Sequence, residues 1–116
     1  MHFKLIIAMV EDEHTVRVLD AARRAGATGA TVVEQARGEG MVPAKTFFGL
    51  DLDSNRDLIL FLVEEHLSRR ILEHIARVGR FDEEHGNGIA VQIDVEDAVG
   101  VVRQTQQLRG TVEDEL

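Results

Sequence analysis

Six consecutive apolar residues, LILFLV at positions 58–63, constrain the fold more than any other feature of this chain. A strand with one face in water alternates apolar and polar side chains, so an unbroken run predicts a strand that is covered on both faces. Residues 3–10 show the same pattern, with Lys4 as the one polar interruption. A chain of 116 residues folds as one domain whose helices can cover one face of a small sheet. We therefore expect a second copy of the chain to cover the other face.

The composition excludes several classes of protein. With no cysteine, the chain forms no disulfide, thiolate metal site or cysteine nucleophile. A formal net charge of −8 repels nucleic acid and anionic membranes, and without Trp or Tyr few rings can stack on bases. No apolar run approaches the roughly 20 residues that span a bilayer, and no leader sequence is recognised. We expect a cytoplasmic protein with no nucleic-acid partner and no membrane insertion.

Apolar periodicity and turn residues divide the chain into alternating strands and helices. We expect strands at residues 2–10, 29–36, 56–64 and 89–94, helices at 13–25 and 65–78, and an extended arm at 45–52. Gly26 stands where a helix cap belongs. The order β-α-β-β-α-β predicts an α+β, ferredoxin-like fold with both helices on one face of an antiparallel sheet. We expect this domain at residues 1–110 and an acidic tail at 111–116.

Within one chain, nothing is left to cover the second face of that sheet. Either Ile6, Ala8 and Val10 or their neighbours of opposite parity would meet water there. Each such side chain forfeits about 1.5–3 kcal/mol when it stays exposed. The sequence therefore predicts a homo-oligomer that is buried through its sheet faces.

Four segments carry a likeness to a known family. They are KLIIAM from Lys4, ATGATVVE from Ala27, RGEG at 37–40, and GNGIAVQI from Gly86 followed, after Asp94, by VEDAV at 95–99. In order and spacing they resemble the PII (nitrogen-regulatory) signal-transduction proteins and their PII-like relatives. The resemblance extends over residues 3–102, and it rests on the combination of segments rather than on one motif.

The resemblance implies a homotrimer with three clefts between subunits. Each cleft would bind an adenine nucleotide (AMP, ADP or ATP), often with 2-oxoglutarate, and a loop would regulate a transporter or metabolic enzyme in nitrogen or carbon metabolism. It implies a regulator that responds to a small anionic metabolite and acts on a target protein that the sequence does not name. The residues themselves show no Ser-His-Asp or Cys-His pattern and no recognisable catalytic pair of carboxylates, so we expect no enzyme activity, no metal and no covalent cofactor.

The resemblance also implies binding residues by position. The cleft would be lined by Arg37, Gly38, Glu39 and Gly40 of one subunit and by Gly86, Asn87 and Gly88 of its neighbour, with Arg103 nearby. Glycine allows backbone N–H groups to approach phosphate oxygens closely, which suits an anion site.

Three positions depart from the family's pattern. The lysine after the glycine turn is Ile89 here, and the paired arginines fall at Gly100 and Val102. Those cations normally neutralise a triphosphate, so the phosphate count of the nucleotide stays open, as does sensing of 2-oxoglutarate or bicarbonate. The cations that we would test for an anionic ligand are Arg37, Lys45, Arg80 and Arg103.

Two other classes of function are alternatives to the PII-like regulator. A CutA-like trimeric metal-associated protein shares the sheet order, but it needs converging ligands, and only residues 11–14 and 83–85 offer weak ones. His66 and His74 are roughly 12 Å apart along a helix, too far to share a metal. A small ferredoxin-like enzyme would need a polar sheet face. Phe48, beside Phe47, is a candidate contact for a neighbouring subunit or a target.

Overall fold

The structure is a computed structural model that describes residues 1–36, 46–47, 50–51, 56–83, 88–103, 105–106 and 109. Its elements in chain order are β1 (Phe3–Glu11), the 3-10 helix η1 (Asp12–His14), α1 (Thr15–Arg24), β2 (Thr31–Ala36), β3 (Thr46–Phe47), β4 (Leu50–Asp51), β5 (Arg56–Glu64), α2 (Glu65–Gly79) and β6 (Gly88–Asp94). All the expected strands and helices are present. The expected arm at 45–52 contains a small antiparallel pair, β3 with β4.

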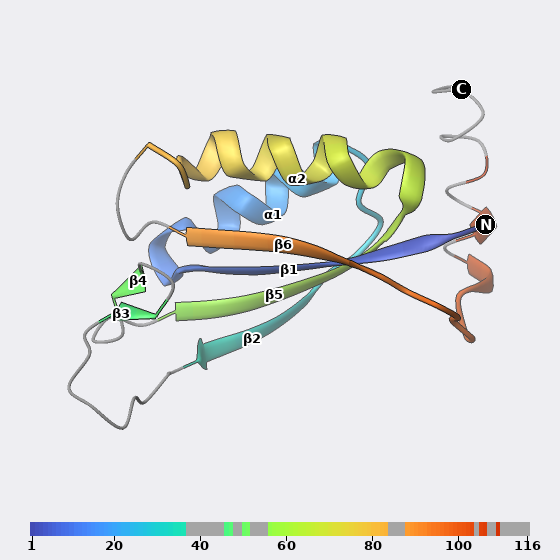
Figure 1. The fold of residues 1–116 in the computed structure, drawn as a ribbon, viewed down its shortest axis with the longest axis horizontal. Helices are drawn as coiled ribbons and strands as arrows, with labels where there is room; N and C mark the ends of the chain where they lie inside the picture. The colour runs from blue at the N-terminus through green and yellow to red at the C-terminus, as the bar shows by residue number, and fades with distance from the viewer. Residues whose placement is uncertain are drawn as a thin grey trace.

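The main sheet has the strand order β2-β5-β1-β6, and every neighbouring pair is antiparallel. Both helices lie on the same side of this sheet (Figure 1). The predicted ferredoxin-like βαββαβ fold is therefore confirmed. Among the described residues, no helix is long and apolar enough to cross a bilayer.

The two helix ends use different residues for the left-handed turn. After α1, Gly26 has φ of 120°, as expected for a glycine cap, and a Cβ there would lie 3.1 Å from Leu67 Cδ1. After α2, the expected loop start at Gly79 was wrong by one residue, because Gly79 still belongs to the helix. The left-handed residue is Arg80, with φ of 56°.

The core lies between the helices and one face of the sheet. Ile6, Ala8 and Val10 of β1 are fully buried there. They pack with buried residues of β5, α1 and α2, among them Ile59, Phe61, Val63, Val18, Leu67, Ile71 and Ile75. The structure thus decides the parity that the sequence left open, since the even-numbered side chains of β1 face the helices.

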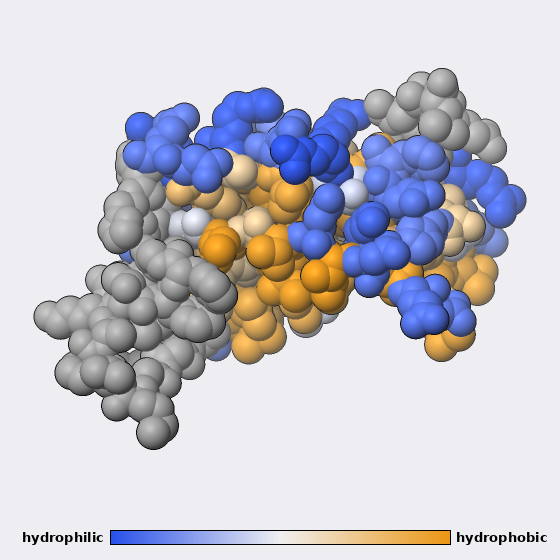
Figure 2. All heavy atoms as spheres, in the orientation of Figure 1, coloured by the Kyte–Doolittle hydropathy of each residue, from blue (hydrophilic) through white to orange (hydrophobic). Residues whose placement is uncertain are grey.

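The residues of opposite parity form an apolar lattice on the open face of the sheet. The cross-strand partners place three aliphatic side chains on each of three adjacent strands: Leu5, Ile7 and Met9 on β1, Leu58, Leu60 and Leu62 on β5, and Ile89, Val91 and Ile93 on β6. Val91 and Ile93 are 45% and 48% exposed. Figure 2 shows apolar side chains gathered over the strands, in contrast to the polar helix layer. We call these nine residues the open-face lattice.

Candidate functional site

Gly88, one of the predicted binding residues, begins β6 next to the end of α2. A Cβ at Gly88 would lie 2.6 Å from Phe81 Cε1, and a Cβ at Gly79 would lie 2.3 Å from the same atom. Both distances are shorter than a carbon–carbon contact allows. The ring of Phe81 therefore occupies a slot between Gly79 and Gly88, where neither residue has a side chain. This contact connects the end of α2, before residues 84–87, to the start of β6 after them.

A shallow groove of about 240 Å³ adjoins this slot between α2 and β6. Leu72, Ala76 and Phe81 give it an apolar side, and its charged groups are Arg69, Glu73 and Asp82. Arg69 Nε donates to Glu73 Oε1 at 2.9 Å. These three side chains carry a formal charge of −1 together, so they do not neutralise a phosphate. An anion at Gly88 would need backbone N–H groups or cations from outside this groove.

The other predicted binding residues fall into two groups. Arg37, Gly38, Glu39, Gly40, Gly86 and Asn87 lie outside the described residues. Arg103 is described, exposed and in a helical turn, but it follows the far end of β6, whereas Gly88 begins that strand (Figure 1). Seven strand residues separate the two ends by about 20 Å. One copy of the chain does not bring Gly88 and Arg103 together.

The structure also describes the three positions that depart from the family's pattern. Ile89 pairs with Met9 and belongs to the open-face lattice, so its side chain does not point to the helix side of Gly88. Gly100 has φ of 82°, a conformation that favours glycine. Val102 is 69% exposed. Of the remaining test cations, Arg80 donates from Nε to Glu83 Oε2 at 3.1 Å, and Lys45 lies outside the described residues.

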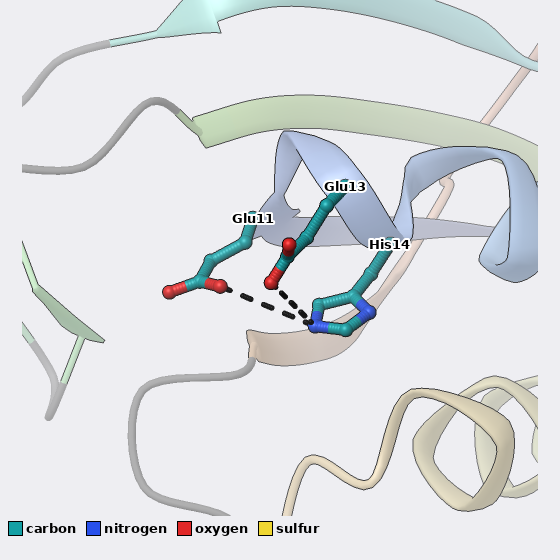
Figure 3. Close-up of side chains that lie close together, drawn as sticks. All are labelled: Glu11, Glu13 and His14. Atoms are coloured by element: carbon teal, nitrogen blue, oxygen red, sulfur yellow. Dashed lines mark ion pairs between the residues drawn. The ribbon is translucent and has the colours of Figure 1, made fainter.

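One group of carboxylates and imidazole lies where β1 ends. His14 Nε2 is 3.5 Å from Glu13 Oε1 and 4.0 Å from Glu11 Oε2, as Figure 3 shows. The other oxygen of Glu11 is 3.5 Å from the buried guanidinium of Arg56. This arrangement could hold a divalent ion, but Arg56 competes with any cation for Glu11.

A second group of this kind surrounds the start of α2. Glu64 is buried and accepts hydrogen bonds from the His66 backbone N–H at 2.8 Å and from its Nδ1 at 2.6 Å. The carboxylate therefore caps the helix. The hydrogen bond to Glu64, together with the negative charge of that carboxylate, raises the pKa of His66 above the ordinary 6.5. This group is explained by helix capping without a metal.

Sequence reasoning missed the role of Phe81. Phe81 falls between the expected helix at 65–78 and the expected strand at 89–94 and was given no role there, whereas its ring holds the start of β6 against the end of α2. The available signal was an aromatic residue with a glycine on each side in the sequence, Gly79 two residues before it and Gly88 seven residues after it. That signal is weak, because glycines in loops also serve turns.

Several solved structures share this fold, whereas no curated protein matches the chain. The chain is 26% identical to a PII-like signaling protein from Thermus thermophilus, with TM-score 0.59, over 82% of this chain and 87% of that one. It is 25% identical to CPII from Thiomonas intermedia K12 bound to ADP, AMP and acetate, with TM-score 0.60, over 83% and 90%. CPII bound to ADP and bicarbonate is also 25% identical, with TM-score 0.55, over 84% and 91%.

The family profile described as nitrogen regulatory protein P-II matches residues 3–106, which is most of the chain. The solved relatives agree with it in name and in fold. This is a family of regulators rather than of enzymes. The chain belongs to the nitrogen regulatory protein P-II family.

Proposed function

We propose that this chain is a cytoplasmic PII-like regulator that binds an adenine nucleotide in clefts between the subunits of a homotrimer. The observation that carries the proposal is CPII, a 25% identical relative that binds ADP and AMP and aligns with 83% of this chain. A second CPII structure holds ADP with bicarbonate. A small anion bound beside the nucleotide is therefore part of the proposal, and the target protein is left unnamed.

The charges of the chain favour a nucleotide with few phosphates. The groove beside Gly88 has a formal charge of −1, and the family's lysine and paired arginines are replaced by Ile89, Gly100 and Val102. Each phosphate that lacks a cation is held less tightly, because charge-assisted hydrogen bonds are roughly twice as strong as neutral ones. We therefore expect AMP or ADP to bind more tightly than ATP.

Assembly would bring together cleft residues that come from two different subunits. The open-face lattice provides the surface for association, and it leaves the loops at the sheet ends to meet between subunits. Residues 37–40 of one subunit and 86–88 of its neighbour would then line one cleft. Nucleotide binding would act on a target by favouring one state of residues 37–53, which requires only different affinities for two states.

Calorimetric titration with AMP, ADP and ATP, each with and without bicarbonate, tests the proposal. Gly86→Val should abolish nucleotide binding, because a branched side chain blocks the approach of phosphate to the backbone. Gly29→Ala is the matched control, since a Cβ at Gly29 meets nothing within 4 Å. Equal affinity in the two variants, or no heat with any nucleotide in the unmodified protein, would refute nucleotide sensing.

A parallel titration with divalent metal ions tests the CutA-like alternative. The Glu11, Glu13 and His14 group is the arrangement that would support it. Metal binding that is lost in His14→Gln, without nucleotide binding, would replace the regulator proposal by the metal-associated one.

Phe48→Ala should weaken assembly or capture of the target if that ring makes the predicted contact.

A further inference from the structure

The end of α2 holds Phe81 by its backbone. Arg80 adopts the left-handed conformation, and its N–H donates to the carbonyl oxygen of Arg77 at 3.2 Å. The next N–H, that of Phe81, donates to the carbonyl oxygen of Ala76 at 3.0 Å. These two bonds form a Schellman motif, which is frequently accompanied by an apolar contact between its end residues. Phe81 and Ala76 line the same groove, so the motif fixes the backbone from which the ring projects.

The ring of Phe81 is also held against β6. It is partly buried and packs against the core. The three atoms nearest to a Cβ at Gly88 all belong to this ring, and Gly88 pairs on its other side with Val10 of β1. The end of α2 and the start of β6 lie at the same end of the molecule (Figure 1). Gly88 is therefore confined between the sheet and a ring that is itself anchored to the helix.

This confinement matters for a glycine that binds through its backbone. Glycine populates more backbone conformations than any other residue, so it loses the most freedom when a ligand orders it. If the fold has already ordered the residue, the ligand does not bear that loss. Fixing the backbone of one residue in advance changes a dissociation constant by about 5–30-fold. A ring that fills the space beside Gly88 can supply such an effect.

We propose that Phe81 is a positioning residue for ligand binding at Gly88. This inference rests on the proposed function, in which Gly88 is a binding residue. Phe81 acts through Gly88 and does not itself contact the ligand. Its ring holds the backbone of Gly88 in the conformation that binds a nucleotide phosphate, so that the ligand does not have to order this residue.

Calorimetric titration of the full chain with ADP compares the same substitution at two sites. Phe81→Leu removes the ring beside Gly88, whereas Phe61→Leu removes a ring that is 1% exposed in the core. Circular dichroism identifies a temperature at which both variants are folded. Phe81→Leu should raise the dissociation constant of ADP about 5–30-fold, with a less favourable entropy of binding, because the ligand must then order Gly88. Phe61→Leu should leave both quantities unchanged.

Backbone relaxation of Gly88 without nucleotide tests the same role independently of binding. The order parameter of Gly88 should be about 0.85 in the unmodified chain and in Phe61→Leu, and below about 0.6 in Phe81→Leu. An equal loss of ADP affinity in the two variants would overturn the proposal, because it would assign the loss to stability. So would a Gly88 that stays rigid in Phe81→Leu. If the unmodified chain bound no nucleotide, the proposed function would fail on that titration alone, and the relaxation data would still decide whether Phe81 fixes Gly88.

Discussion

At the scale of single residues, the packing of Phe81 against two glycines gives the sharpest expectation. Gly88→Ala places a Cβ about 2.6 Å from Phe81 Cε1, so the ring must move. Overpacking of this kind costs typically about 1–3 kcal/mol. We expect the free energy of unfolding, measured with urea, to fall by this amount. Gly29→Ala should be neutral or slightly stabilising, because it meets open space and restricts the unfolded chain.

A double-mutant cycle tests whether the ring of Phe81 causes the loss of stability in Gly88→Ala. In a Phe81→Leu background the same Gly88→Ala change should cost clearly less, because the smaller side chain leaves room. An undiminished cost would show that the strain comes from another contact at β6.

A second residue-scale prediction concerns His66 and pH. Glu64 raises the pKa of His66 in the folded chain, so the folded state holds this proton more tightly than the unfolded one. The stabilisation is complete below the ordinary pKa of 6.5 and is lost as pH rises through the raised value. His66→Gln should therefore lower the melting temperature more at pH 5.5 than at pH 9. His74→Gln, on the same helix, is the control. A loss that does not change with pH would contradict the ion pair.

At the scale of elements, one buried hydrogen bond connects the start of α1 to β5. Thr15 Oγ1 donates to Asp57 Oδ2 at 2.6 Å, and both residues are buried. Thr15→Val keeps the shape but removes the donor, and a buried acceptor that loses a partner costs about 1–3 kcal/mol. Thr15→Ser retains the hydroxyl and should cost less. Equal losses of unfolding free energy in the two variants would assign the effect to packing instead.

The elements themselves were largely predictable from sequence. The unbroken apolar run of β5 and the repeat of Leu67, Ile71 and Ile75 in α2 each specify one type of element, because their spacing fits one period. The end of α2 was not predictable to the residue, since Arg80 adopts a left-handed turn that glycine usually takes. The parity of β1 was also open, because its side chains are apolar on both faces and the pattern does not distinguish them.

The candidate site was less predictable, for a physical reason. The proposed cleft lies between subunits, and a site of that kind has no signature along one chain. The sequence identified Gly88 through family resemblance, but it did not show that Phe81 fills the space beside this glycine. Arg103 illustrates the same limit, since its place after β6 separates it from Gly88 within one copy.

At the scale of the whole molecule, the open-face lattice is the surface through which we expect the chain to associate. Ile7 lies at its centre, with Leu60 and Val91 as cross-strand partners. Burying a fully exposed side chain of this kind contributes about 1.5–3 kcal/mol. Val91 and Ile93 are the most exposed of the nine, and the other seven are already partly buried in one chain, so each of those contributes less. Because the helices on the other side of the sheet are polar, we expect a second copy of the chain to cover this lattice.

Ile7→Glu puts a charge in the middle of this lattice, where association would have to bury it without a partner at a cost of several kcal/mol. By sedimentation equilibrium at micromolar concentration, the unmodified protein should have about three times the chain mass of 12.9 kDa, and the variant should have the mass of one chain. Val16→Glu is the matched control, because Val16 is 78% exposed on α1 and lies outside the lattice. Its trimer should persist. If Ile7→Glu also remained trimeric, association through the sheet face would be wrong, and a cleft built by neighbouring subunits would lose its basis.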